Sequence, residues 1–442
     1  MEVSTERDEK GLETAMIAVA VRHRILLVSL VSTTVEFYSF FVYATAAAVV
    51  LGPLYFPSSS SVAQLLSAWG SFALAFVARP LGAALFGHFG DRRGARSALA
   101  GAMLLMGGST FAIGLLPTHA TIGWAAPVLL CLFRFGQGLG LGGQWGGAVL
   151  IAVDGAPANR RGLYAMVPQL GAPLSFMIAN GIFLLLGSIL SETSFLAWGW
   201  RIPFLLATPL MAIGFWMRQT LTDPQVALEG AVAAPRLPIA SLLRHEGAAV
   251  MIGTLGVVAC FVLYYLATAF ALGHATTTLG HSRQQFLLVQ ICVMPFMALG
   301  TIIAGGLSDA IGHRTVLLSG AVLTIIVGLL LGPAVGGAWN IASAIFLCAA
   351  LLVLGLMYGT LAGWLPTLFS AKLRYTGTSL AFNVAGVVGG ALTPLFSTFL
   401  THLGGLHAVG IYVALAGAVS AFAVMASRRY DRALVPSNAF LA

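Results

Sequence analysis

The ten residues GHFGDRRGAR at Gly87–Arg96 return with the same spacing as GGLSDAIGHR at Gly305–Arg314. In both copies an aspartate follows the first glycine by four positions, and a second glycine and an arginine follow the aspartate by three and five. Each copy comes directly after a long apolar run. A repeat of this kind indicates a chain built from two similar halves.

The residues around both copies are apolar enough to lie in lipid. Hydrophobic residues make up 59% of the 442 positions and charged residues only 8%, which excludes a water-soluble fold. Lipid offers the backbone no hydrogen-bond partner, and the apolar runs are too long for barrel strands, so each must be a helix. We expect an all-α integral membrane protein of about twelve transmembrane helices, near residues 25–50, 63–88, 97–116, 123–152, 163–187, 201–217, 247–272, 285–307, 315–335, 340–365, 378–402 and 407–426.

The predicted spans divide into two six-helix bundles related by pseudo-two-fold symmetry. A polar stretch with several prolines, 218–246, is predicted to be a cytoplasmic linker between an N-terminal bundle, 25–217, and a C-terminal bundle, 247–426. Residues 1–24 and 427–442 are predicted to be a cytoplasmic N-terminal segment and a cytoplasmic tail. Parallel halves with a solute site between them are a known plan of membrane transporters, so we expect a transporter and not an enzyme.

The basic residues predict the orientation. When the spans alternate sides from a cytoplasmic N terminus, nearly all lysines and arginines fall on the cytoplasmic side; Arg201 and Arg283 lie at the opposite face, and Arg79 and Arg134 lie within spans. This asymmetry predicts a multi-pass protein of the inner (plasma) membrane with both termini cytoplasmic. It also explains the net charge of +8 without a nucleic-acid partner. The four cysteines show no ligand-type spacing with histidines, so no metal and no cofactor are expected.

The fourth span is rich in glycine. Gly138, Gly140 and Gly143 spell the GxGxxG dinucleotide fingerprint, but no strand precedes them and they lie within a membrane-length apolar run. Gly138, Gly142 and Gly146 recur every fourth residue, which favours close packing of this helix against a neighbour.

At the two repeats the sequence resembles the major facilitator superfamily, whose loop signature after the second and eighth helices is GxxxDRxGR. Longer stretches resemble its metabolite:proton symporter family, and 121–206 is most similar to the shikimate-type branch; they are TTVEFYSFFVYATAAAVVLGPLYF at 33–56, ARPLG at 78–82, GHFGDR at 87–92, QGLGLGGQWGGA at 137–148, WGWRIPFLL at 198–206 and RYTGTSLAF at 374–382. The resemblance implies proton-driven uptake of a solute such as shikimate, 2-oxoglutarate, citrate, proline or betaine.

Four positions depart from the family pattern, and one of them is Ala95, which replaces a common arginine in the first loop motif. Phe37 and Ser39 stand where the family usually has a tryptophan and an aspartate, and Gln144 stands where it usually has a glutamate. Two carboxylates that could carry protons within the membrane are therefore absent.

Glu36 is the acidic residue that lies deep within a span. A helix that begins near residue 26 places it roughly 15 Å into the membrane, where an idle carboxylate is costly. Ser32, Glu36, Ser39 and Tyr43 share one stripe of that helix, which should face a cavity and not lipid. We predict that Glu36 carries the coupled proton; the alternative is a structural glutamate satisfied by neighbouring hydroxyls.

Arg134 lies at a comparable predicted depth in the fourth span, with Gln137 and Gln144 on roughly the same side. A buried guanidinium needs an anionic partner, which could be Glu36 or an anionic group of the solute. In the resulting hypothesis Arg134 holds Glu36 ionised until an entering carboxylate competes for Arg134, and Glu36 then takes up a proton. A purely structural ion pair is the alternative.

Other polar residues within spans are weaker candidates, because such groups often only bond a neighbouring helix. Gln169 and Tyr265 form the preferred pair, one from each half, which could close around a solute. The full set of predicted solute-binding residues is Arg134, Tyr43, Gln137, Gln144, Gln169, Tyr265, Tyr358 and Asn383.

The repeated loops are predicted to gate the carrier. Asp91 and Asp309 stand at cytoplasmic helix ends, where charge pairs could latch one state. The predicted gating residues are Gly87, Asp91, Arg92, Arg96, Asp309 and Arg314. The alternative is a tight-turn anchor at Gly94 and Gly312.

The leading prediction is a monomeric carrier, embedded in the lipid bilayer, that takes up a small organic carboxylate together with protons. The alternatives are a carrier of zwitterions such as proline or betaine, an uncoupled facilitator or efflux carrier, which Ser39 and Gln144 would favour, and a membrane sensor that moves no solute.

Overall fold

The structure is a computed structural model that describes residues 2–58, 61–93, 95–154, 156–157, 159–219, 238–335, 341–370 and 373–430. The side chains of residues 2–25 and 87–99 are outside this description, as are those of a few further positions. The described part of the chain is helical and contains no strand.

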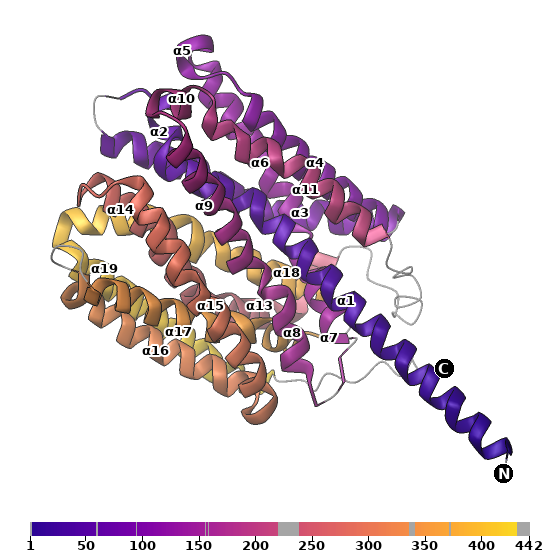
Figure 1. Cartoon of the computed structure of the whole chain (residues 1–442). Helices are drawn as coiled ribbons and strands as arrows, with labels where there is room; N and C mark the ends of the chain where they lie inside the picture. The colour runs from indigo at the N-terminus through magenta and orange to yellow at the C-terminus, as the bar shows by residue number, and fades with distance from the viewer. Residues whose placement is uncertain are drawn as a thin grey trace.

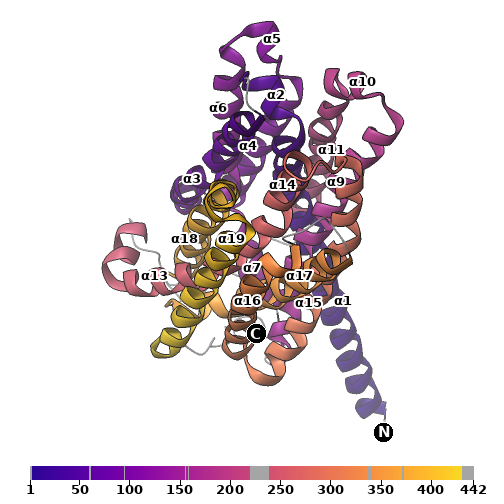
Figure 2. The same ribbon diagram turned by 90° about the vertical axis from the view of Figure 1, so that its left-hand side faces the viewer.

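The first half of the chain forms one bundle, coloured indigo to magenta in Figure 1. Its elements are α1 (Glu2–Val49), α2 (Leu51–Tyr55), α3 (Ser61–Arg93), α4 (Ala95–Leu115), α5 (His119–Ile122), α6 (Ala125–Gly142), α7 (Trp145–Asp154), α8 (Arg161–Gln169), α9 (Gly171–Ile189), α10 (Glu192–Ala197), η1 (Gly199–Arg201) and α11 (Ile202–Gln219). The first residues of α1 extend away from the bundle, at the end opposite α5 and α10 (Figures 1 and 2).

The second half forms the other bundle, coloured orange to yellow. Its elements are α13 (Pro238–Tyr265), η2 (Leu266–Phe270), α14 (Ala271–Thr277), α15 (Arg283–Ile311), α16 (His313–Val335), α17 (Ile341–Trp364), η3 (Leu365–Leu368), α18 (Arg374–Ala385), η4 (Gly386–Ala391), α19 (Leu392–Ala426) and η5 (Ser427–Arg429). The predicted linker, 218–246, lies in part outside the described residues; α13 begins at Pro238 and bends at Glu246.

Nine described segments are long and apolar enough to cross a membrane. One of them, Arg374–Arg429, contains two spans, because Gly404 and Gly405 break α19. Gly405 has φ +63°, a conformation that glycine adopts without strain. With the shorter apolar stretch of α4, Ala100–Leu115, and with α11, these segments account for the twelve predicted spans.

Several spans are irregular where the sequence predicted continuous helices. The fourth is interrupted at Gly143 and Gln144, between α6 and α7, and the fifth at Leu170, between α8 and α9. The seventh and eleventh contain π-helical segments, η2 and η4. Such segments are frequent at functional sites.

The predicted close approach of the fourth span to a neighbour is confirmed, and the neighbour is α3. A Cβ atom at Gly138 would collide with the backbone of Ala75, and one at Gly142 with the backbone of Arg79. The missing side chains let the two backbones touch, which holds Arg79 and Arg134 on adjacent helices.

The two bundles meet along several helices. From the first half, α8 packs against α15 and α17, and α9 packs against α15. On the other side of the interface, α3 packs against α18 and η4. The seam between the halves is therefore the region to examine for a solute site.

Candidate solute-binding site

Arg134 is fully buried in α6. Its Nη1 atom donates to Oε1 of Gln137 at 2.8 Å, and Nε2 of Gln137 donates in turn to the Thr110 hydroxyl of α4 at 2.7 Å. The guanidinium carbon lies 4.1 Å from the ring centroid of Tyr43, with the rings of Phe40 and Phe72 also within 5 Å. Aromatic faces attract a cation, so the three rings stabilise part of the charge.

The predicted ion pair between Arg134 and Glu36 is not formed in this conformation. Nε and Nη2 of Arg134 have no hydrogen-bond partner among the described residues, and Nη1 is bound to Gln137. The physical reason is depth. Arg134 lies against Phe40 and Tyr43, which are about 6 to 10 Å further along α1 than Glu36.

The polar stripe of α1 faces the protein interior, as predicted. Ser32, Glu36, Ser39 and Tyr43 are all buried, with Glu36 only 3% exposed. The Tyr43 hydroxyl bonds the Ser71 hydroxyl of α3 at 2.6 Å. Ser39, between Glu36 and Tyr43 on the stripe, lines a small cavity that Arg134 and Gln137 also line.

Arg79 of α3 is a second buried cation, which the sequence analysis placed within a span but did not assign to the site. Its guanidinium carbon lies 4.4 Å from the ring centroids of both Phe40 and Phe76, and both of these rings pack against Tyr265 of the second half. Nε and Nη2 have no hydrogen-bond partner among the described residues. An arginine inside a span is itself the signal that could have identified it.

Tyr265 lies at the centre of an aromatic cluster that joins the halves. Its ring centroid is 5.6 Å from that of Phe72 and 5.4 Å from that of Phe76, both on α3, and 6.2 Å from that of Phe40 on α1. Tyr264 packs beside it and against Phe41. The structure thus brings Tyr265 to Arg79.

Gln169 also bridges the halves, through Trp145 of the first half and Tyr358 of the second. Its Oε1 accepts from Nε1 of Trp145 at 3.2 Å, and its Nε2 donates to the backbone carbonyl of Tyr358 at 2.9 Å. Gln169 therefore joins Tyr358, which is buried in α17, and not Tyr265.

The interruption between α6 and α7 is stabilised by the second half. Asn383 donates to the Gly142 carbonyl at 3.0 Å, the Tyr375 hydroxyl donates to the Gly143 carbonyl at 2.5 Å, and the rings of Trp145 and Phe382 stack 3.6 Å apart. These side chains satisfy carbonyls that lie at the helix break.

Gln144 occupies the same break. It is only 1% exposed, and neither its amide nitrogen nor its amide oxygen has a hydrogen-bond partner among the described residues. A buried amide without partners is costly, and a bound polar group would offset that cost.

The halves are joined at the end near α7 and α8 by Asp309. Its Oδ1 accepts from the backbone nitrogen of Gly162 at 2.6 Å, and Oδ2 accepts from that of Leu163 at 3.1 Å. The carboxylate thereby caps the first turn of α8, where it meets the positive end of the helix dipole.

Arg314, another predicted gating residue, does not share this contact. Arg314 donates to the carbonyls of Val424 and Met425, at the end of α19 in its own half, and not to Asp309. The side chains of Gly87, Asp91, Arg92 and Arg96 lie outside the described residues.

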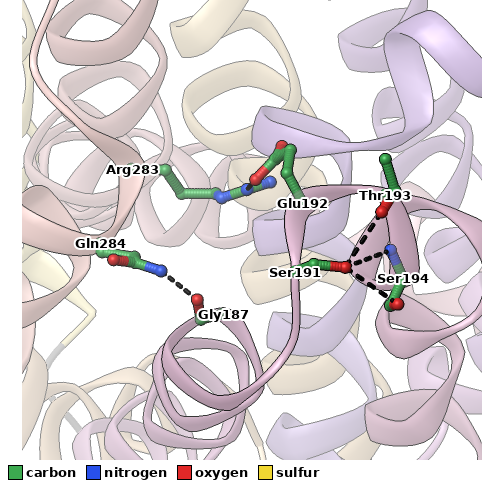
Figure 3. Close-up of polar contacts among 7 residues, drawn as sticks. All are labelled: Gly187, Ser191, Glu192, Thr193, Ser194, Arg283 and Gln284. Carbon is green, nitrogen blue, oxygen red and sulfur yellow. Dashed lines mark hydrogen bonds and ion pairs between the residues drawn. The ribbon is translucent and has the colours of Figure 1, made fainter.

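At the opposite end, the halves are joined by an ion pair that the sequence analysis did not identify (Figure 3). Nη2 of Arg283 lies 2.7 Å from Oε2 and 2.9 Å from Oε1 of Glu192. Nearby, the Gln284 side chain donates to the Gly187 carbonyl. Because the two residues are far apart in the chain, no local sequence pattern predicts that they pair.

Buried cations and aromatic rings thus lie beside the seam between the halves, and contacts join the halves at both ends. Within the described ranges, no group of three or more His, Cys, Asp or Glu side chains is arranged to hold a metal ion.

Comparison with known proteins gives the same fold and a common class of activity. The profile of the family "Sugar (and other) transporter" matches residues 25–223. The chain is 40% identical to the inner membrane metabolite transport protein YhjE of Escherichia coli, over 91% of this chain and 93% of that one. It is 35% identical to the shikimate transporter of E. coli, over 73% of each chain, and 30% identical to the proline/betaine transporter of E. coli, over 79% of this chain and 72% of that one.

Among solved structures, the proton:xylose symporter XylE bound to 6-bromo-6-deoxy-D-glucose superimposes with a TM-score of 0.72, covering 93% of this chain and 96% of that one at 17% identity. XylE is a major facilitator superfamily protein. At this identity the likeness concerns the fold alone, and it confirms the predicted architecture of two bundles.

Proposed function

The chain belongs to the metabolite transporters of the major facilitator superfamily, and from this premise we propose that it takes up a small organic carboxylate together with protons. The proposal includes residence in the inner membrane with both termini cytoplasmic, which the distribution of lysines and arginines favours.

The observation that carries the proposal is Arg134. It is fully buried, it lines a small cavity, and two of its guanidinium nitrogens have no partner among the described residues. A buried charge is strongly disfavoured unless an anion pairs with it. A carboxylate solute would supply that anion, with two hydrogen bonds from one edge of the guanidinium.

The remaining contacts of Arg134 would hold it ready for such a solute. Gln137 fixes Nη1 by a hydrogen bond and is itself fixed by Thr110, so the guanidinium plane has a defined orientation. Tyr43, bound to Ser71, covers one side of the charge. An orientation fixed in advance lowers the entropic cost of binding.

Glu36 remains the proposed proton carrier, by a route that differs from a direct exchange of partners at Arg134. A carboxylate bound at Arg134 would lie about 6 to 10 Å from Glu36 along α1. In a poorly solvated interior, a second negative charge at that distance favours the neutral, protonated form of Glu36. Solute and proton would then load together.

Two contacts would alternate in transport. Opening toward the cytoplasm requires that Asp309 leave the first turn of α8, and opening toward the outside requires that the Arg283–Glu192 pair separate. Alternation of this kind, around a fixed central site, is the common mechanism of such carriers.

Uptake into proteoliposomes tests the proposal. Radiolabelled shikimate, 2-oxoglutarate, citrate and proline are offered with and without an imposed pH gradient, and accumulation of a carboxylate that depends on the gradient is expected. Glu36→Gln should keep solute exchange and abolish uphill accumulation. Glu229→Gln, an acid in the predicted cytoplasmic linker, is the matched control and should accumulate solute normally. Unchanged accumulation by Glu36→Gln would contradict the role of Glu36.

One observation favours an uncoupled facilitator as the second candidate function. Gln144 and Ser39 are buried in the interior, and neither side chain can exchange a proton as a carboxylate does. In that case the carboxylate would equilibrate across the liposome membrane, and the pH gradient would leave its final distribution unchanged.

A zwitterionic solute would leave a different signature. Arg134→Gln should nearly eliminate binding of a carboxylate, because the substitution removes its counter-charge. The same variant should weaken binding of betaine or proline much less, because these solutes also carry a positive charge.

A further inference from the structure

Arg79 and Arg134 belong to one charged site. Their guanidinium carbons lie 4.4 Å and 4.7 Å from the centroid of the same ring, that of Phe40. The two carbons are therefore at most about 9 Å apart. Two like charges at this separation repel each other, and the repulsion is strong in an interior from which water is excluded.

The same edge is free on both guanidinium groups. In each, Nε and Nη2 have no hydrogen-bond partner among the described residues. The N–H groups of these two nitrogens lie along one edge of the planar guanidinium, and they are the pair that can donate to both oxygens of one carboxylate. Both side chains are buried, Arg79 with 3% of its surface exposed and Arg134 with none.

Within the described part of the chain, aromatic rings and a neutral amide contact the two guanidinium groups. Phe40, Phe72, Phe76 and Tyr43 cover the guanidinium faces. The hydrogen-bond partner of Arg134 is the neutral amide of Gln137. A single carboxylate would neutralise one arginine and leave the other buried without an anion.

We infer that the transported solute is a dianion, with one carboxylate on the free edge of Arg134 and a second on that of Arg79. This inference rests on the proposed function and narrows its substrate class. A separation of at most about 9 Å between the guanidinium carbons suits a short dicarboxylate, whose two carboxylates are joined by only a few carbon atoms.

The second carboxylate would also link binding to movement. The guanidinium of Arg79, in the first half, lies over the rings of Phe40 and Phe76, and these rings pack against Tyr265 of the second half. A carboxylate on Arg79 therefore binds next to an aromatic contact that joins the two bundles. Arg134, by contrast, donates its hydrogen bond to Gln137 within its own half.

Ligands matched in carbon skeleton and different in charge test the inference. Binding to the purified full-length protein is measured by calorimetry for succinate, its monomethyl ester, 2-oxoglutarate, citrate, shikimate and betaine. We expect at least one dianion to bind, and to bind at least 10-fold more tightly than the monoanions. Arg79→Gln should reduce that preference to less than about 3-fold, whereas Arg134→Gln should weaken dianions and monoanions alike.

Two further variants control for folding and for net charge. Arg79→Lys keeps the charge but loses the planar guanidinium, so it should retain part of the preference for dianions over monoanions. This variant replaces Arg79→Gln in the test if Arg79→Gln does not fold. Arg428→Gln removes an exposed charge in η5 and should bind as the unaltered protein does.

The outcomes separate this inference from the proposed function. Tight binding of shikimate that depends on Arg134, with no preference for any dianion, would contradict the inference of a dianionic solute. The proposal of a carboxylate carrier would be unaffected. Binding of betaine but of no carboxylate overturns both. A dianion affinity that neither Arg79→Gln nor Arg79→Lys alters overturns the second subsite.

Discussion

Asp309 of the second half caps α8 of the first half, with Oδ1 2.6 Å from the backbone nitrogen of Gly162. The aspartate belongs to the repeated loop motif, and the nitrogen that it binds belongs to the other bundle. One side chain therefore joins the halves at the end near α7 and α8.

Asp309→Asn should loosen that end. The substitution removes the negative charge and one of the two acceptor oxygens that serve Gly162 and Leu163. Charge-assisted hydrogen bonds contribute about 1.5 to 3 kcal/mol each, so the open state should gain on the order of 10-fold in population. A cysteine at Ser379, buried at the seam against Gly146, should react faster with a maleimide in a protein whose native cysteines are replaced.

Arg314→Gln is the matched control for Asp309→Asn. Arg314 bonds carbonyls of α19 within its own half, so its loss should lower the thermal midpoint and leave the labelling rate at Ser379→Cys unchanged. Equal acceleration in both variants would show that the whole loop, and not the Asp309 cap, holds this end closed.

The Arg283–Glu192 pair should act as a weak latch at the opposite end. The two side chains are 17% and 67% exposed, and exposed ion pairs contribute only about 0.2 to 1 kcal/mol. Glu192→Gln or Arg283→Gln should raise the labelling rate of a cysteine at buried Ala275 by less than about 5-fold, and added salt should shrink the difference. Exchanging the two charges should restore slow labelling; no effect of any variant at low salt would exclude a latch.

Hydropathy, helical periodicity and the repeated motif predicted those features that depend on one helix at a time. Arg134 and Gln137 are one turn apart on the same helix, so their contact follows from spacing, and the glycines at 138 and 142 predicted a close neighbour for that helix. The burial of the polar stripe around Glu36 follows from the same reasoning.

Contacts between distant helices could not be predicted in the same way. The depth of Arg134 relative to Glu36 depends on the position of α6 along α1. In the structure Arg134 lies about two helical turns beyond Glu36, so the predicted ion pair is not formed. Arg79 meets Tyr265, and Asp309 meets Gly162, only because the two bundles dock. A single sequence does not record which helices face each other.

Gly142→Ala should destabilise the protein through the α3–α6 contact. The added methyl group would meet the backbone carbonyl of Arg79, which cannot move aside as a flexible side chain can. Overpacking of this kind typically costs about 1 to 3 kcal/mol, and the thermal midpoint of the purified protein should fall accordingly. Gly181→Ala is the matched control, because a methyl group there meets no atom within 4 Å. Equal midpoints for the two variants would contradict the close approach.

Gln144→Glu should add a proton to the transport cycle. The Gln144 amide has no hydrogen-bond partner among the described residues, so a carboxyl group of the same shape replaces it without breaking a bond. In the closed interior that carboxyl is more stable when protonated, and it can release the proton when one end opens. For one additional proton, the accumulation ratio should rise about 10-fold more per unit of pH gradient. Gln169→Glu, where the amide donates to Tyr358, should instead lose stability. A slope of accumulation against pH gradient that is identical in Gln144→Glu and in the unaltered protein would show that this position does not exchange protons during transport.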